Sequence, residues 1–438
     1  FTALAHFWKG DMYYKTTDYN NAFNSMQNFI ARSSTVPISD QVSHGTANYT
    51  MGYALFKQGQ YRQALPYFES SVAQLGGKPE LMNALTVTSQ VYPDAILRAG
   101  DCYFMQKNYT KANEQYDDVL KYGLRGADYA AYQKGILAGL AGKPADKVDL
   151  LTQMTKKYPE SLYLDDAWYQ IALAHSSQEN YEAAINAHKT VIGKYPQSSY
   201  FRKSLLNLGL LSYNTNNYEQ SLKYYQQLLR DYPKSSEAQD ALVGIKDVYI
   251  AKGDADGYVT LIKQYPDVNF TVSAQDSLSY QIAENYYSQG DCNKAVSSFD
   301  KYLKSYPKGA FALYAHFYRG QCLYSRPDYK AADDDYTYVI EQPNNLFTDQ
   351  ALDKATQIAL LHEKNYEKAY TYSKRLYENA ARKDLRLDAL RNSMRAAYYL
   401  KKENDLDARI DLLLKENDKT ADDEIEAYFY RGMLAYNK

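Results

Sequence analysis

Several residue types that would point to particular protein classes are scarce in this 438-residue chain. It has three cysteines, Cys102, Cys292 and Cys322, spread over more than half of the chain. An odd number at these wide spacings argues against a disulfide framework and against a zinc site, so all three are expected to be small buried residues. No apolar run approaches the roughly 18 residues of a membrane-spanning helix, so no transmembrane segment is expected.

An excess of either charge is also missing. Lys and Arg total 50 against 52 for Asp and Glu, and the two signs are interspersed along the chain. Because binding to phosphates needs a concentrated basic field, nucleic acid is not expected as a partner.

Motifs for catalysis or cofactor binding are absent. The sequence has no HExxH, Gly-x-Ser-x-Gly, P-loop or GxGxxG fingerprint. His175 and His188 fall in one structural unit, but no further ligands at metal spacing accompany them, so both are expected in the core. The run Asp333 to Asp335 lacks the alternating ligands of a calcium loop and is interpreted as a solvated helix face. The sequence therefore predicts no enzyme, no catalytic or metal site and no cofactor.

Tyrosine, by contrast, is abundant, with 48 copies, and it marks an internal repeat. A short pattern recurs in which an anchor tyrosine is followed, three residues later, by Ala or Ser. The anchors are Tyr19, Tyr61, Tyr109, Tyr181, Tyr218, Tyr329 and Tyr366, with weaker copies at Pro144, Cys292 and Asp405. Several neighbouring anchors, such as Tyr181 and Tyr218, are 37 residues apart, a period that chance does not maintain.

Each unit also has a small residue nine positions before its anchor and a bulky residue seven positions after it. The small residues are Gly52, Gly100, Gly135, Ala172, Gly209 and Gly320, and the bulky ones include Phe68, Tyr116, Tyr225 and Tyr336. Apolar residues on both sides of the anchor follow helical spacing, which predicts two helices per unit. The small residue would let the first helix approach the second closely.

Tyr-Pro pairs separate successive units. They occur at Tyr158-Pro159, Tyr195-Pro196, Tyr232-Pro233, Tyr265-Pro266 and Tyr306-Pro307. Because proline cannot continue a helix, each pair predicts the end of a second helix. Ser161, Ser198 and Ser235 follow two residues after three of these prolines, where each is expected to cap the next helix by accepting an amide proton.

These features resemble the tetratricopeptide repeat, whose signature runs Trp, Leu-Gly, Tyr, Ala, an aromatic residue and Pro. Two units carry it as Trp168, Ile171-Ala172, Ala184, His188 and Pro196, and as Leu208-Gly209, Ser221, Tyr225 and Pro233. The resemblance covers almost the whole chain. It implies an all-α, right-handed superhelix of about eleven helical hairpins whose concave face binds protein. The 37-residue unit with Tyr-Pro-x-Ser is similar to the subtype of bacterial outer-membrane assembly lipoproteins and Tol-Pal accessory proteins, and the tyrosine content resembles large Bacteroidota members.

The repeat predicts one continuous solenoid over residues 1–438 with irregular units near 33–47, 75–93 and 248–270. Residues 424–438 match a first helix without its partner and are predicted to be an incomplete final repeat. The chain begins at Phe1 rather than Met, inside helical pattern. A processed or truncated fragment is therefore expected, and a signal peptide, lipid anchor or further domain would lie outside it.

Two rows of aromatic residues on the first helices form the candidate partner-binding surface. The earlier row, twelve residues before the anchor, is Tyr49, Tyr132, Tyr169, Tyr280 and Phe317. The later row, five before the anchor, is Phe56, Phe104, Tyr213, Tyr287 and Tyr324. Positions seven apart share a helix face, which in tetratricopeptide arrays lines the concave groove. Such rings would suit an extended peptide, a partner helix or a glycan, or would instead pack against the neighbouring unit.

Three functions from different classes follow from these observations. The first is a non-catalytic protein-binding scaffold in bacterial envelope assembly or transport, placed by the resemblance in the periplasm or at the outer membrane, with the cytoplasm as the alternative. The second is a carbohydrate or peptidoglycan binder that uses the tyrosine rows. The third is the presenting array of a larger enzyme whose catalytic part lies outside residues 1–438.

Overall fold

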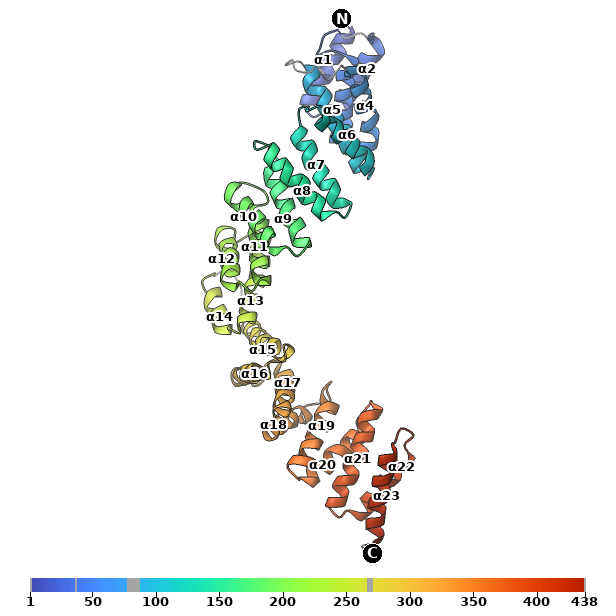
Figure 1. Ribbon diagram of the computed structural model, residues 1–438, viewed down its shortest axis with the longest axis vertical. Helices are drawn as coiled ribbons and strands as arrows, with labels where there is room; N and C mark the ends of the chain where they lie inside the picture. Colours follow the sequence, from blue (N-terminus) through green and yellow to red (C-terminus); the bar gives the residue numbers. More distant parts are fainter. Residues whose placement is uncertain (1, 36–37, 77–86, 266–270, 437–438) are drawn as a thin grey trace. The chain divides into compact units, whose positions relative to one another are not determined.

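A computed structural model of the chain describes residues 2–35, 38–76, 87–265 and 271–436 (Figure 1). These residues form 23 α-helices and one π-helical turn, with no strand among them. Twenty of these helices pack as ten consecutive pairs, and a final helix, α23 (Ala421–Tyr436), ends the described residues. The all-α helical-repeat prediction is therefore confirmed. The chain divides into two compact units, Phe1–Ala241 and Leu242–Lys438, and helix α13 (Ser236–Lys252) contains the boundary.

The first unit holds six hairpins, each with a first and a second helix. In chain order the helices are α1 (Thr2–Lys15), α2 (Tyr19–Arg32), α3 (His44–Lys57), α4 (Tyr61–Leu75), α5 (Val87–Met105), α6 (Tyr109–Lys121), α7 (Ala127–Leu140), α8 (Pro144–Lys157), α9 (Leu164–Ser177), α10 (Tyr181–Lys194), α11 (Phe201–Asn214) and α12 (Tyr218–Asp231).

The second unit continues the same alternation. Its helices after α13 are α14 (Ala255–Ile262), α15 (Val272–Ser288), α16 (Cys292–Ser305), α17 (Ala312–Ser325), α18 (Tyr329–Glu341), α19 (Thr348–Gln357) with the π-helical turn η2 (Ile358–His362), α20 (Tyr366–Asn379), α21 (Lys383–Tyr399), α22 (Glu403–Lys415) and α23. No helix in the described segments combines the length and apolarity needed to cross a membrane.

The anchor residues begin the second helices. All seven anchor tyrosines, together with Pro144 and Cys292, are the first residues of their helices. The weak copy at Asp405 is the exception, because α22 begins at Glu403, 37 residues after Tyr366. Asp or Asn immediately before the anchor often caps the helix: Asp18, Asn108 and Asn217 each accept a hydrogen bond from the amide three residues on.

The residue two before the anchor turns the chain through a left-handed conformation. Six positions that are neither glycine nor proline have φ between 56° and 63° there, namely Thr17, Lys107, Glu179, Asn216, Lys364 and Lys401. Gly59, Gly142 and Gly290 hold the equivalent place in other hairpins, with φ between 72° and 75°. A non-glycine residue in this region is strained, so the turn is imposed by the packing of the two helices rather than by local preference.

The predicted contact of small with bulky residues builds each hairpin. A β-carbon placed on Gly52 would lie 2.9 Å from Cε1 of Phe68, and one on Gly100 would lie 2.8 Å from Cε1 of Tyr116. In both cases the bulky residue is sixteen positions after the glycine and fully buried. The glycine therefore provides the close approach that the ring requires.

The three irregular segments each depart from the regular hairpin. Between α2 and α3, the described residues 33–35 and 38–43 belong to no helix. Before α5 the chain passes through residues 77–86, which lie outside the described residues, and α5 then runs for 19 residues with Pro93 inside it. Helix α14 has only eight residues. Residues 36–37, 266–270 and 437–438 of the irregular and final units also lie outside the described residues, and one continuous solenoid remains a prediction.

Four of the five Tyr-Pro pairs end second helices as expected, since Tyr158, Tyr195, Tyr232 and Tyr306 are the C-cap residues of α8, α10, α12 and α16. The fifth differs, because α14 ends at Ile262 with Lys263 as its C-cap, and Pro266 lies outside the described residues. The three serines that follow these prolines do not all cap the next helix. Ser235 accepts from the amide of Ala238 in the first turn of α13, at 3.1 Å, and so caps that helix. Ser161 and Ser198 accept amides only two residues on, at 3.2 and 3.0 Å, and stabilise the turn before the helix instead.

The cysteines correct the expectation from the sequence. Cys292 at the start of α16 forms a disulfide with Cys322 in α17, while Cys102 is free and buried. The pair was missed because its 30-residue separation has no motif. It becomes close only when successive repeats are stacked. The bond joins two consecutive hairpins covalently.

The acidic run Asp333 to Asp335 in α18 is not the solvated helix face that the sequence predicted. Asp335 is buried and accepts from Arg319 at 2.7 and 2.9 Å and from His316 at 2.6 Å. Asp333 is also buried and forms an ion pair with Lys368 of α20. Of the three aspartates, only Asp334 is exposed. These carboxylates are tolerated inside because each has a cationic partner from a neighbouring helix.

Candidate functional site

All ten residues of the two aromatic rows lie on first helices. They come from α3, α5, α7, α9 and α11 in the first unit and from α15 and α17 in the second. Eight are half-buried, whereas Tyr280 and Phe317 retain only 3% and 2% of their surface. The rows therefore exist as the repeat predicts, and their contacts decide how much ring surface a partner could reach.

The earlier row stacks on the next repeat. Tyr169 lies against Tyr200 with ring centroids 4.4 Å apart, and Tyr280 lies against Phe311 at 4.7 Å. Two further stacked pairs of this kind are Tyr132 with Tyr163 and Phe317 with Phe347. In all four pairs the second ring belongs to the residue that precedes the following first helix. The ring faces of this row thus join consecutive repeats.

Four of the five later-row residues pack within their own hairpin, and Tyr287 packs on the next one. Phe56, Phe104, Tyr213 and Tyr324 each contact the anchor tyrosine five residues on, with centroids 5.1 to 5.8 Å apart. Tyr287 has a cysteine as its anchor and contacts Tyr318 instead, at 4.6 Å. All five residues stay half-buried, so part of each ring remains accessible. This row is the better candidate for contact with a partner.

Tyr49 of the earlier row belongs to a polar cluster that the sequence did not reveal. The hydroxyls of Tyr49 and Tyr53 both donate to Asp94, at 2.7 and 2.5 Å. Arg98, one turn along α5, pairs with Asp101, and the Arg98 guanidinium lies 5.9 Å from the ring of Phe56. Burial and the nearby Asp94 raise the pKa of the Tyr49 hydroxyl far above its ordinary value, so it stays protonated and donates.

Asp101 is a second carboxylate of the same polar cluster. It accepts from Tyr116 at 2.7 Å and from Tyr129 at 2.9 Å in addition to the pair with Arg98. Burial raises the pKa of Asp101, while Arg98 and the two hydroxyls oppose that rise. The hydrogen bonds of this cluster link α3, α5, α6 and α7, while Nε of Arg98 is left without a hydrogen-bond partner among the described residues.

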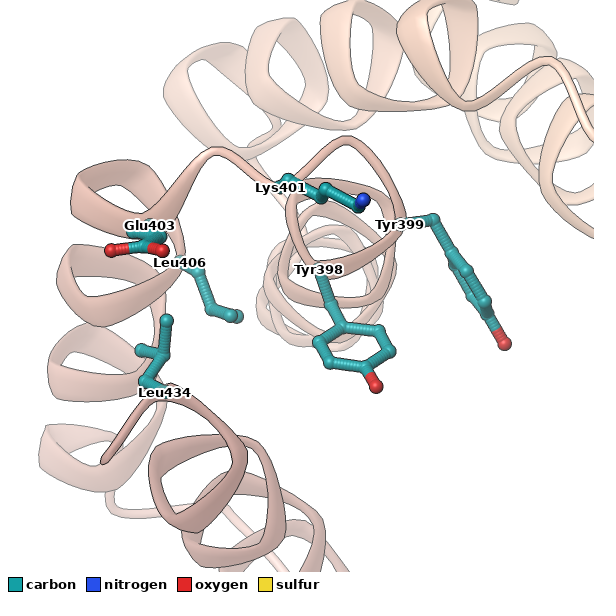
Figure 2. A pocket seen from close by; sticks show the side chains of 6 residues that line it. All are labelled: Tyr398, Tyr399, Lys401, Glu403, Leu406 and Leu434. Carbon is teal, nitrogen blue, oxygen red and sulfur yellow. The ribbon is translucent and has the colours of Figure 1, made fainter. Parts of the chain in front are cut away.

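An open pocket of about 650 Å³ lies beside the loop that joins α21 to α22 (Figure 2). It is lined by Tyr398, Tyr399, Lys401, Glu403, Leu406 and Leu434. Figure 2 shows Leu406 and Leu434 on the same side of Tyr398, with Tyr399 on its other side. Tyr399 stacks on Tyr366 at 4.4 Å and still exposes 52% of its surface. The pocket offers rings, one cation and one carboxylate.

Neither His175 nor His188, the two histidines of the α9–α10 hairpin, belongs to a group of described side chains that could hold a metal ion. His188 is buried, contacts the ring of Tyr169 and lies 3.2 Å from the hydroxyl of Ser204 through Nδ1. Burial lowers the pKa of His188 to about 4, so it is neutral at pH 7. Among the described residues no group of three or more His, Cys, Asp or Glu side chains is arranged to hold a metal ion.

Comparison with known proteins identifies the repeat. One model of the tetratricopeptide repeat matches residues 49–130 and 280–345, and a second matches residues 166–198 and 203–235. The matched segments are tetratricopeptide repeats. They include nine of the ten residues of the two rows, all except Tyr132. No curated protein matches the sequence.

The chain also has low similarity, with TM-scores below 0.5, to solved structures. The Pseudomonas aeruginosa pilF structure is 14% identical, with a TM-score of 0.40, and the match covers 55% of this chain and 96% of that one. A tetratricopeptide repeat protein from Parabacteroides merdae is 15% identical, with a TM-score of 0.32, over 61% of this chain and 98% of that one.

Proposed function

We propose that this chain is a non-catalytic scaffold that binds a protein or peptide partner through the faces of its first helices. Tetratricopeptide repeats generally mediate protein–protein interactions, and such repeats account for the matched segments. The observation that carries the proposal is the later row, which places one half-buried ring at the same position of five hairpins. Rings held in this way present contact area at a low cost in side-chain entropy.

We further propose that the scaffold works outside the cytoplasm, in the periplasm or at the outer membrane, in envelope assembly or transport. The disulfide between Cys292 and Cys322 supports an oxidising compartment, because cytosolic thiols are kept reduced. Free-thiol labelling of protein taken from the native cells tests this placement. One reactive thiol per denatured chain is expected, and three would contradict it.

Affinity capture with matched variants tests the partner-binding role. The double variant F104A/Y213A removes two later-row rings, and Y122A removes a ring that is 48% exposed just after a second helix. We expect a protein bound by the wild-type chain and by Y122A to be lost from F104A/Y213A. Helical circular dichroism of each variant establishes that it is folded. Equal capture by all three folded proteins would contradict the proposal.

A carbohydrate partner is the second candidate, and the pocket beside Tyr399 favours it. An exposed ring next to Lys401 and Glu403 provides a stacking surface together with a donor and an acceptor of hydrogen bonds. A glycan array probed with the wild-type chain and with Y399A tests this function. Saturable glycan binding that Y399A abolishes would support it, and no binding to any glycan would remove it.

A further inference from the structure

The hairpin of α7 and α8 departs from the repeat pattern at two positions that contact each other. Every anchor tyrosine is followed, three residues later, by a fully buried Ala or Ser, whereas the anchor of α8 is followed by Lys147. Five residues before that anchor, where five other hairpins carry a later-row ring, α7 has Gly139. A β-carbon on Gly139 would lie 2.8 Å from Cδ of Lys147 and 3.5 Å from its Nζ. The lysine side chain therefore takes the place of the ring and brings its ammonium group to the first helices.

This ammonium group has a neutral hydrogen-bond partner instead of a carboxylate. Nζ of Lys147 donates to Oε1 of Gln170, in the next first helix, α9, at 2.6 Å. Lys134 of the same hairpin forms an ion pair with Asp117, whereas no ion pair within the described part of the chain includes Lys147. Burial lowers the pKa of Lys147, as expected for a cation without a nearby anion. The hairpin thus holds a half-buried positive charge that no carboxylate of the described residues compensates.

Exposed apolar side chains border the charge in three first helices of the same unit. Leu140 of α7 directly follows the glycine and is 54% exposed, and Met105 holds the same place in α5 and is 51% exposed. Leu210 of α11 is 48% exposed and shares a helix face with the later-row tyrosine three positions on. Because α5 precedes and α11 follows the hairpin that carries Lys147, a segment bound along these helices would continue past the ammonium group on both sides. Its anion would then be a side chain inside the segment rather than the terminal carboxylate.

We propose that Lys147 and Gln170 form a subsite for the side-chain carboxylate of an Asp or Glu that lies between apolar residues in a segment of the partner protein. The ammonium group of Lys147 pairs with the carboxylate, and the amide of Gln170 donates a second hydrogen bond to it. The apolar neighbours of the acidic residue lie against Leu140 and the later-row rings. A charge-assisted pair is strengthened where the site is partly shielded from water. The subsite rests on the proposed partner-binding function and adds an amino-acid preference to it.

Selection from a displayed library of random dodecapeptides tests this preference. The peptides are fused to the coat protein through their C-terminal ends, so none has a free terminal carboxylate. We expect the whole wild-type chain to enrich peptides with an acidic residue between apolar ones at least about fivefold, the effect of about 1 kcal/mol. K147M keeps most of the apolar stem over Gly139 and removes the charge, and Q170E supplies a carboxylate to Lys147 from within the chain. Both variants are expected to lose the enrichment.

The matched control is K156M. Lys156 is an exposed residue of α8, nine positions after Lys147 and therefore on the opposite side of the helix. K156M removes one positive charge from the same helix and should retain the enrichment of acidic peptides. Helical circular dichroism of each variant establishes that it is folded.

Binding of the most enriched peptide measures the contribution of the carboxylate. The peptide is synthesised with a terminal amide, and a second peptide has the neutral Asn or Gln in place of its acidic residue. By fluorescence anisotropy the wild-type chain should bind the acidic peptide at least about fivefold more tightly, whereas K147M should bind both within about twofold. A free carboxylate at the end of the acidic peptide should change the affinity by less than about twofold.

Three outcomes would overturn the subsite. The first is equal enrichment of acidic peptides by the wild-type chain and K147M. The second is that the wild-type chain selects peptides without an acidic residue, which would leave the partner-binding function intact. The third is a large gain in affinity from a free terminal carboxylate, which would assign the site to a chain end instead. Selection of no peptide at all by the wild-type chain would contradict the proposed function together with the subsite.

Discussion

Substituting Gly209 by alanine tests the contact that builds the hairpins. A β-carbon at this position would lie 2.5 Å from Cδ1 of Tyr225, whereas carbon atoms pack at about 3.5 Å. The ring would have to withdraw by about 1 Å. It has little freedom to do so, because Tyr225 is 3% exposed and Ser221 holds the same turn by donating to the carbonyl of Gly209 at 2.7 Å.

The magnitude follows from two opposing effects. Alanine in place of an interior helical glycine stabilises by up to about 1 kcal/mol, and overpacking of a close contact costs about 1–3 kcal/mol. G193A in α10 introduces alanine at an exposed glycine with open space, so it retains the benefit without the overlap. Both variants gain helix propensity from alanine, so this gain roughly cancels when the two are compared. The free energy of unfolding of G209A should therefore be about 1–3 kcal/mol lower than that of G193A.

Urea unfolding followed by helical circular dichroism measures this difference. Hydrogen exchange locates it, since the amides of α11 and α12 should exchange faster in G209A while those of α3 and α4 should not. Replacing Tyr225 with alanine in a G209L background should recover part of the stability lost by G209L, because the leucine then fills the vacated space. Equal stability of G209A and G193A would refute the assigned contact.

Three further predictions concern other parts of the molecule. Replacing Cys292 and Cys322 together with alanine should destabilise the second unit by about 3.5 kcal/mol, as expected for a loop of this length, and a reducing agent should then have no further effect in thermal melts. His188 is neutral in the fold, with its pKa lowered to about 4 by burial, so the unfolded state binds more protons between that pH and about 6.5. Stability should rise with pH across this window, and H188L should flatten the rise in urea titrations at several pH values. F317A should lower the free energy of unfolding by about 3–5 kcal/mol because Phe317 is buried against Phe347, whereas Y428A on the exposed face of α23 should change it by less than about 0.5 kcal/mol; similar losses in urea unfolding of both variants would contradict the difference in burial between these two rings.

The sequence predicted the hairpins because their contacts have a fixed spacing. Gly100 and Tyr116, sixteen residues apart, are close in any hairpin with this register, and the anchor tyrosines mark where second helices begin. The left-handed turn two residues before the anchor was not found, because Thr17, Lys107 and Glu179 have no local preference for it. Packing of the two helices determines that conformation.

Contacts between repeats were the part that the sequence did not predict. The disulfide of Cys292 with Cys322, the pair of Asp333 with Lys368 and the stack of Tyr280 on Phe311 all join residues of different repeats. The disulfide has no counterpart at another junction among the described residues, so no repeated spacing reveals it, whereas the ring stacks recur at a separation of 31 residues in three of their four pairs. The same limit applies to the aromatic rows, because ring faces that cover a neighbouring repeat and ring faces that bind a partner have the same pattern in the sequence.

Cross-linking of the captured partner to the chain, with the linked residues identified by mass spectrometry, tests the scaffold function most directly. The account predicts that cross-links from a protein partner concentrate on the first helices that carry the later row, α3, α5, α11, α15 and α17. Cross-links confined to the second helices, such as α6, α12 and α18, would contradict it.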